Sequence, residues 1–331
     1  MTGPTAAHDR AVVGASAGAG ASAGPGASAG ARASAGVGAS ADPLLRGAAA
    51  PVRPPVQPST SPAVRLRNVT AGYDGAPAIE DITLDISTGS LVAILGPNRG
   101  GKSTALKVIA GLLRPWSGTV EVLGRPAGRE ARRIAYVPQA EGVDWSFPVT
   151  VWDVVMMGRY PRLGPLRRPG PADRDAVHEA LHAVSMAEFA RTQIGSLSGG
   201  QRRRAFLARA LAADPDLYLL DEPVTGVDIG TQEDLMHVLE AESVRGKTIV
   251  ATTHDLGAAA HHFDRLIAIN RHVVASGVAS EVLASEVLAR IYGPHMLMLD
   301  GQARIFDDAH HHDTEAPGEA GHHHDTGHGH G

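Results

Sequence analysis

One loop constrains this chain more than any other part of its sequence. Residues 96–103, with the sequence GPNRGGKS, match the pattern G-x-x-x-x-G-K-[ST]. A short apolar run at residues 91–95 precedes the loop, and apolar residues recur at helical spacing over residues 102–113. In this context backbone N–H groups and the positive end of a helix dipole meet at the loop and favour phosphate binding. A glycine-rich turn without a ligand is the weaker interpretation, because the Lys-Ser pair fits the same context.

The loop predicts a nucleoside triphosphate site with Mg²⁺. Lys102 can reach the β- and γ-phosphates, and Ser103 can ligate the metal ion. We expect nucleotide contacts from Gly96, Pro97, Asn98, Arg99, Gly100, Gly101, Lys102, Ser103 and Thr104.

The rest of the pattern predicts an α/β fold. Strands are expected at residues 64–69 and 82–86, and buried strands at residues 91–95, 134–137, 217–220 and 248–252. Helical patterns at residues 202–212 and 232–243 separate later strands, which favours a mostly parallel sheet covered on both faces. Residues 140–195 are mainly helical, with helices expected at 149–157 and 172–184, and predict an inserted helical subdomain.

Composition divides the chain into three parts. Residues 1–62 are rich in Ala, Gly, Ser and Pro, and the repetitive stretch at residues 14–41 lacks large apolar side chains, so a disordered tail is expected. Residues 63–306 form the expected folded domain, and residues 307–331 a second disordered tail.

Charge, cysteine content and hydropathy exclude several classes of protein. The net charge of −5 argues against a nucleic-acid binder with a broad basic surface. The absence of cysteine excludes disulfides and thiolate ligands. We find neither an apolar run of the roughly 18–20 residues that span a bilayer nor a secretory signal pattern. If the protein works at a membrane, it is therefore expected to dock onto another subunit.

Two acidic residues end a buried strand at residues 217–222, LYLLDE. Ligands bind at the carboxyl edge of a parallel sheet, so Asp221 can hold the magnesium shell and Glu222 can orient and deprotonate an attacking water. In isolation, the same pair would more often be a solvated turn.

A second glycine-rich helix start follows the helical insertion at residues 197–201, LSGGQ. It is another potential anion-binding site, and one chain rarely needs two such sites for one nucleotide. With this motif, the sequence over residues 64–292 resembles the nucleotide-binding domain of ABC transporters, whose signature motif is LSGGQ.

The resemblance implies a P-loop ATPase with a mostly parallel sheet core, an antiparallel β subdomain and an inserted helical subdomain. It also implies a homodimer in which the signature of one subunit caps ATP held by the phosphate loop of the other. The signature residues expected at that nucleotide are Ser198, Gly199, Gly200 and Gln201.

Four more positions gain roles through the resemblance. Tyr73 matches an aromatic residue that stacks on adenine, although alone it is equally a strand-edge residue. Gln139 matches a glutamine that senses magnesium and the attacking water, and Asp228 an aspartate that crosses the dimer seam. His254 matches a histidine at the γ-phosphate, whereas a histidine after a strand is usually structural. The implied catalytic residues are Glu222, His254, Gln139 and Lys102, and the implied Mg²⁺ ligands are Ser103, Gln139 and Asp221.

Arg99 departs from the family pattern, which usually has glycine there. We expect strain if φ at Arg99 is positive, with Gly100 able to absorb part of the backbone demand. We expect ATPase activity to survive.

The residues after Gln139 indicate the transported substrate. Residues 143–150 and 153–159 resemble the ATPases of zinc and manganese uptake systems. Trp145, Phe147 and Trp152 either line a groove for a helix of a membrane subunit or form ordinary core packing. The resemblance implies permease subunits, an extracytoplasmic metal-binding protein as indirect partner, and a location at the cytoplasmic face of the membrane.

The C-terminal tail is rich in histidine, which is a good ligand for Zn²⁺ and a poorer one for Mn²⁺. These residues are His310, His311, His312, His322, His323, His324, His328 and His330. We expect weak or moderate metal binding there rather than a fixed tetrahedral site. Two other functions stay open: a soluble ABC ATPase of translation or DNA repair, and a metal-buffering protein whose ATPase function is lost.

Overall fold

The computed structural model of the 331-residue chain describes residues 62–139, 147–164, 167–293, 296–299 and 302–305. All of them belong to the second of two units, Pro54–Gly331. The tails expected at residues 1–62 and 307–331 lie outside the described residues except for Pro62.

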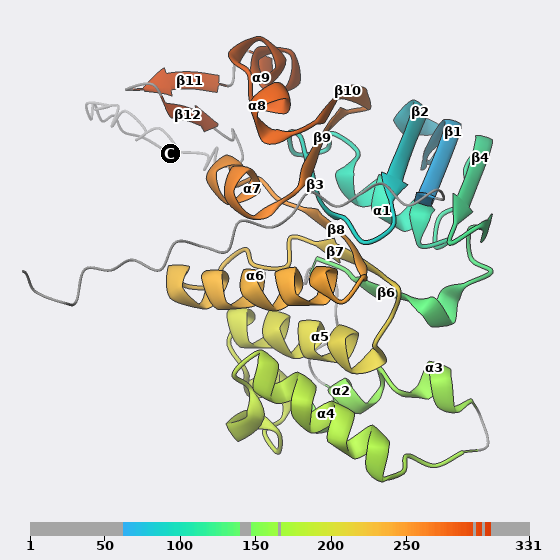
Figure 1. The fold of residues 1–331 in the computed structure, drawn as a ribbon, viewed down its shortest axis with the longest axis vertical. Coiled ribbons are helices and arrows are strands. Elements are labelled where there is room, and N and C mark those ends of the chain that lie inside the picture. The colour runs from blue at the N-terminus through green and yellow to red at the C-terminus, as the bar shows by residue number, and fades with distance from the viewer. Residues whose placement is uncertain (1–61, 140–146, 165–166, 294–295, 300–301, 306–331) are drawn as a thin grey trace, which may run out of the picture. The chain divides into compact units, whose positions relative to one another are not determined.

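A six-stranded sheet forms the centre of the domain, in the order β10-β9-β3-β8-β7-β6 (Figure 1). Its strands are β3 (Leu91–Leu95), β6 (Ile134–Val137), β7 (Leu217–Asp221), β8 (Thr248–Thr252), β9 (Arg265–Asn270) and β10 (His272–Gly277). All pairs are parallel except β9 with β10. The parallel sheet expected from the sequence is confirmed.

Both faces of this sheet are buried, which explains the continuous apolar runs. Leu91, Ala93 and Leu95 of β3 face one core cluster, together with residues of α5 (Gly199–Ala213) and α6 (Ile229–Val244). The alternate residues Val92 and Ile94 face the other cluster. A strand that is covered on two sides has no solvent face for polar residues.

The second cluster lies between the parallel sheet and a four-stranded antiparallel sheet of order β2-β1-β4-β5. Its strands are β1 (Pro62–Tyr73), β2 (Ala76–Ser87), β4 (Ser117–Val122) and β5 (Arg125–Pro126). Exposed and buried residues alternate along the second half of β2, as the sequence predicted for residues 82–86.

Helix α1 (Lys102–Ile109) packs on the same side as the antiparallel sheet. The prediction of a helix through residue 113 was wrong at its end. Gly111 has φ 74°, the Gly111 N–H donates to Val108 O over 3.1 Å, and the Leu112 N–H donates to Lys107 O over 2.9 Å. These bonds form a Schellman motif that stops the helix although apolar residues continue.

The insertion is helical where it is described. It contains α2 (Val151–Met156), α3 (Tyr160–Leu163) and α4 (Pro171–Ala183), followed by the 3₁₀ turns η3 (Ala187–Phe189) and η4 (Ile194–Ser196). Helix α2 starts later than the predicted residue 149 because Thr150 and Asp153 cap it reciprocally. The Arg159 guanidinium pairs with the Asp173 carboxylate over 2.9 Å and ties the start of α3 to α4.

The sequence did not predict α3, β4, β5, α7, β9, β10 or any element after β10. The later helices are α7 (Leu256–His262), α8 (Ala279–Val282) and α9 (Ser285–Tyr292), and a hairpin joins β11 (Met296–Leu299) to β12 (Gln302–Ile305). Within the described residues, we find no helix with the length and apolar character needed to cross a membrane.

Candidate functional site

The register of the parallel strands brings their carboxyl ends to one edge. Asp221 at the end of β7 pairs with Thr252 at the end of β8, and Ile94 of β3 pairs with Thr252 on its other side. Val137 of β6 pairs with Leu220. The phosphate loop, Gln139, the acidic pair and His254 all lie at or directly after these strand ends, so this edge collects one group of the residues that the sequence singled out.

The phosphate loop is closed on itself. The Lys102 ammonium donates to Gly96 O over 2.9 Å and to Pro97 O over 3.0 Å, and the residue is only 7% exposed. A Cβ on Gly100 would lie 2.9 Å from Pro97 O, and one on Gly101 would lie 2.5 Å from Ile79 Cγ2. The two glycines therefore allow a tight loop whose backbone a ligand can approach closely.

Arg99 has φ 62°, so the positive φ considered from the sequence is present. Gly100 does not share this left-handed conformation, because its φ is not positive. The expectation that Gly100 absorbs part of the backbone strain at Arg99 was wrong. A non-glycine residue in this region costs about 1–2 kcal/mol.

The acidic pair is held by Thr252, a residue that sequence reasoning missed. The Thr252 hydroxyl donates to Asp221 Oδ1 over 2.7 Å and accepts the Glu222 N–H over 2.9 Å. Asp221 is 4% exposed, and Glu222 has φ 51°. A threonine ending an apolar strand was the available signal.

Glu222 lies between two of the residues expected to act with it. The Gln139 side-chain amide donates to Glu222 Oε2 over 3.4 Å, and His254 Nδ1 lies 4.0 Å from Glu222 Oε1. The Glu222 side chain is 14% exposed and that of His254 is 59% exposed. A carboxylate with one amide and one imidazole beside it can accept a proton and pass it towards solvent.

Two tyrosines lie near this edge. Burial raises the pKa of Tyr136 to about 12, with a further contribution from the Asp221 charge, so its hydroxyl stays neutral. That hydroxyl is buried and has no hydrogen-bond partner in the described part of the chain. Tyr73, 44% exposed, has the Lys107 ammonium 5.6 Å from its ring centre and is accessible for stacking.

The signature residues and Asp228 form a second group. Ser198 caps α5: its hydroxyl accepts the Gln201 N–H over 3.3 Å, and Gln201 Oε1 accepts the Ser198 N–H over 2.9 Å. A Cβ on Gly200 would lie 3.1 Å from Val227 Cγ1, so the signature packs against the turn before Asp228. Helix α5 accordingly begins at Gly199, earlier than predicted.

Asp228 is the N-cap of α6, which begins at Ile229 rather than at the predicted residue 232. Its carboxylate accepts the Thr231 N–H over 3.0 Å, and this bond lowers the pKa of Asp228. Asp228 is therefore an anion fixed beside the signature.

Ser103, Gln139 and Asp221 offer oxygen donors at the sheet edge, the ligand type that Mg²⁺ prefers. Three side chains are too few to complete the coordination of Mg²⁺, which fits an ion that keeps water and phosphate oxygens as its other ligands. Across residues 62–139, 147–164 and 167–293, no group of three or more His, Asp or Glu side chains is arranged to hold a metal ion.

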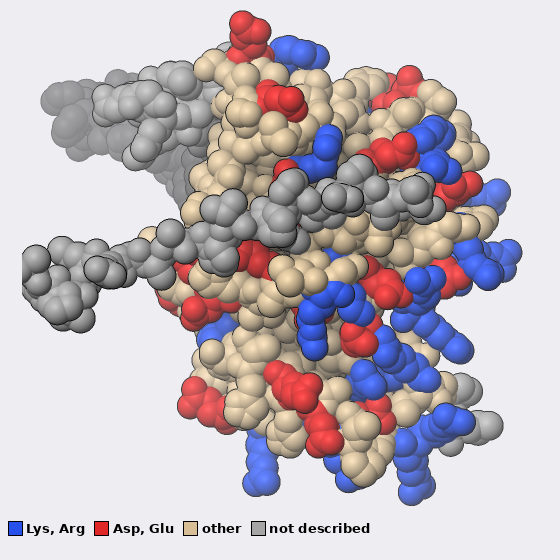
Figure 2. Space-filling model, viewed as in Figure 1, with Lys and Arg blue, Asp and Glu red and all other residues tan. Residues whose placement is uncertain are grey.

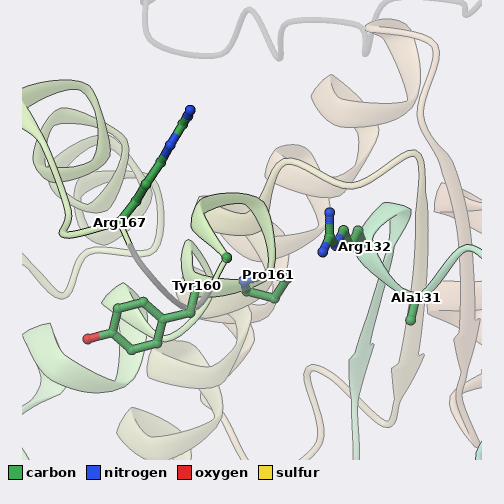
Figure 3. A pocket seen from close by; sticks show the side chains of 6 residues that line it. Ala131, Arg132, Tyr160, Pro161 and Arg167 are labelled. Carbon is green, nitrogen blue, oxygen red and sulfur yellow. The ribbon is translucent and has the colours of Figure 1, made fainter.

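One pocket of about 540 Å³ lies away from the predicted nucleotide residues, none of which lines it. In Figure 3, Ala131 and Arg132 approach from before β6, and Tyr160 and Pro161 from α3. Near it on the chain are exposed apolar side chains: Phe147 is 64% exposed, Met157 39% and Tyr160 51%. Trp152 instead packs inward, with its ring centre 4.7 Å from that of His178, while Trp145 lies outside the described residues.

Surface charges are mixed on the face shown in Figure 2, where Lys and Arg alternate with Asp and Glu. Pairs of opposite charge also lie across strands of the antiparallel sheet, where the Arg67 guanidinium lies 2.7 Å from the Asp85 carboxylate.

Comparisons with known proteins agree with this geometry. The family model for ABC transporters matches residues 79–225. The zinc transport system ATP-binding protein TroB of Treponema pallidum (strain Nichols) is 46% identical over 235 residues, covering 71% of this chain and 88% of the relative. The manganese transport system ATP-binding protein MntB of Bacillus subtilis (strain 168) is 42% identical over 236 residues, covering 71% of this chain and 94% of the relative.

Two solved structures are similar as well. One shows an inward-facing conformation of an ABC transporter described as metal-chelate type, with 26% identity, a TM-score of 0.62 and coverage of 74% of this chain and 96% of that one. The other is a dimeric ATP-binding cassette in a post-hydrolysis state with ADP and phosphate, with 29% identity, a TM-score of 0.58 and coverage of 65% and 98%.

Proposed function

The chain belongs to the ABC transporter family of ATP-binding subunits and is an ATPase, and from this premise we propose that it powers uptake of zinc or manganese through separate membrane subunits. The observation that carries the proposal is its identity of more than 40% to zinc and manganese transport subunits over almost their whole length. Neither a soluble ATPase of translation or repair nor a metal buffer is favoured by these relatives.

In the proposed site, the loop residues and Lys102 bind the nucleotide phosphates, and Tyr73 stacks on the base. Ser103, Gln139 and Asp221 would hold Mg²⁺, which when bound neutralises charge on the phosphate oxygens. The buried bond between Asp221 and Thr252 supports this assignment, because it fixes one oxygen of the acid and leaves the other available.

Glu222 is the proposed general base. It accepts a proton from water as the water oxygen bonds to the γ-phosphorus, and the bond from that phosphorus to the β–γ bridging oxygen breaks. Gln139 orients Glu222 through the 3.4 Å contact, and His254 adds a donor for the phosphate oxygens.

The proposed active form is a homodimer with two ATP molecules, in which Ser198–Gln201 and Asp228 of one protomer meet the loop of its partner. The signature supports this proposal, because the exposed residue Ser198 caps the N-terminus of α5, and a helix N-terminus can bind an anion. The similar solved structure of a dimeric ATP-binding cassette with ADP and phosphate is a precedent for a dimer.

The proposed docking surface for a permease helix consists of the exposed apolar side chains Phe147, Met157 and Tyr160. Apolar side chains on a groove receive the apolar face of a helix. Such docking would place the subunit peripherally at the cytoplasmic face of the membrane, with an extracytoplasmic metal-binding protein as indirect partner.

The histidine-rich tail is a proposed accessory zinc-binding segment and lies outside the described residues. Calorimetry with Zn²⁺ tests it by comparing the full chain with a chain ending at Asp308. Loss of a zinc-binding event on truncation is expected, and equal zinc affinity would contradict the proposal.

Growth of a deletion strain at limiting zinc and at limiting manganese tests the transport function. The wild-type gene should restore growth for the transported metal, Glu222→Gln should not, and Glu179→Gln, an exposed change on α4, should behave as wild type. Normal growth of the deletion strain with both metals scarce would refute a metal uptake role.

A further inference from the structure

Arg99 is unusual within the phosphate loop. Positive φ occurs at Gly96, Arg99 and Gly101, and Arg99 is the one non-glycine residue among them. A glycine at this position would remove the strain that a Cβ causes there. Retention of a strained backbone at a ligand site indicates that the side chain contributes something glycine cannot.

The surrounding backbone prevents Arg99 from relaxing. The Gly100 N–H donates to Pro97 O over 3.0 Å, and Gly100 O accepts the Arg271 N–H over 2.9 Å. Both bonds are made by the backbone of Gly100, and the first closes a turn from Pro97 to Gly100 in which Arg99 is the third residue. The left-handed conformation is thus imposed by the loop itself.

The Arg99 side chain is exposed, and within the described part of the chain it makes neither a hydrogen bond nor an ion pair. Arg271, which contacts the same loop, instead pairs with the Glu80 carboxylate. The Arg99 guanidinium is therefore a cation beside the phosphate loop that no acid among the described residues neutralises.

We propose that Arg99 is a nucleotide-binding residue whose guanidinium binds phosphate oxygens of ATP and adds a second cation to that of Lys102. This rests on the proposed function, in which the loop holds ATP. A guanidinium binds phosphate with two parallel N–H bonds, so an arginine within a phosphate-binding loop is chemically suited to this anion. Because Mg-ATP carries more negative charge than Mg-ADP, Arg99 favours the triphosphate.

The experiment separates the strain from the charge. Full-length wild type, Arg99→Gly, Arg99→Lys and Arg99→Gln are compared for thermal unfolding without nucleotide and for equilibrium binding of ATP and ADP with Mg²⁺. Arg174→Gln, an exposed arginine of α4, is the matched control for loss of one positive charge.

Arg99→Gly is expected to raise the unfolding midpoint by about 2–4 °C, because the strain is relieved. The same variant should bind ATP about tenfold more weakly, with a smaller loss for ADP. Arg99→Gln should show the same loss of ATP affinity without the gain in stability, Arg99→Lys should retain most of the affinity, and Arg174→Gln should match wild type.

ATP affinity in Arg99→Gly equal to or above that of wild type would overturn the inference, as would equal affinities in the Lys and Gln variants. A change confined to dimerisation, with ATP affinity unchanged, would also overturn it. If wild type itself bound no ATP, the proposed function would fail with it. Equal ATP affinity in wild type and Arg99→Gly refutes only the role of Arg99.

Discussion

The Gln139 amide nitrogen lies 3.4 Å from a Glu222 carboxylate oxygen and links the segment after β6 to the acid after β7. Gln139 directly precedes the helical insertion expected at residues 140–195, so this contact joins the proposed base to the start of that insertion.

Glu222→Gln should retain ATP binding within about threefold and lose at least about 100-fold in turnover, because an amide cannot accept the water proton. Nucleotide titration and a phosphate-release assay measure the two effects. Glu179→Gln, on the exposed side of α4, serves as the control. Wild-type turnover by Glu222→Gln would show that another group is the base.

Lys102→Ala should lower ATP affinity by at least about 100-fold, because it removes the buried cation within the loop. It should also destabilise the nucleotide-free protein by about 1–3 kcal/mol, since Gly96 O and Pro97 O lose a charged donor. Lys247→Ala removes a partly buried ion pair with Asp214 and should leave ATP affinity unchanged. Undiminished ATP binding by Lys102→Ala would contradict the assignment of the loop.

Two substitutions of Ser198 distinguish its structural role as the cap of α5 from its proposed role at the nucleotide of the partner protomer. Ser198→Ala should cost about 1 kcal/mol of stability, because the cap of α5 is lost. Ser198→Asp keeps a capping oxygen and should be nearly as stable as wild type, but its charge would repel ATP on the partner and abolish ATP-dependent dimerisation. Urea unfolding and light scattering measure these effects, and normal dimers of Ser198→Asp would exclude the proposed role.

Asp173 should make stability depend on pH. The Gly170 N–H, followed by the Arg159 guanidinium, holds the pKa of Asp173 below its usual range. A depressed folded pKa stabilises the protein above the unfolded value of about 3.9, and this contribution is lost as pH falls through the folded pKa. The free energy of unfolding of the wild type should exceed that of Asp173→Asn by about 1–2 kcal/mol at pH 7.

The Asp173→Asn difference should be constant from pH 7 to about pH 5 and shrink below about pH 4. Urea unfolding at several pH values measures it, with the exposed Asp175→Asn as control. A difference that did not change over this range would mean that the Asp173 charge does not contribute.

The central strands could be predicted from the sequence because both of their faces are buried. Residues 91–95 are all apolar and residues 248–252 have an apolar centre between two threonines, and the structure has strands with those bounds. Strands β4 and β10 carry several exposed residues, so their apolar pattern is weak. Helix ends depended on caps such as Thr150 and Asp228, whose bonds cannot be identified from periodicity alone.

The motifs predicted which residues gather at the site, since loops after neighbouring parallel strands share an edge. They did not reveal Thr252, because its importance comes from the register between β7 and β8 and not from a local pattern. Nor could the sequence decide between Arg99 and Gly100 as the position of positive φ, which the bonds of the closed loop determine.

The molecular mass of Glu222→Gln in solution tests the central claim most directly. This variant is expected to hold ATP without hydrolysing it, so two chains should close around two nucleotides. Light scattering should give the mass of a monomer without nucleotide or with Mg-ADP, and twice that mass with Mg-ATP. A monomer at saturating Mg-ATP, with binding verified on the same sample, would contradict the ATP-driven dimer.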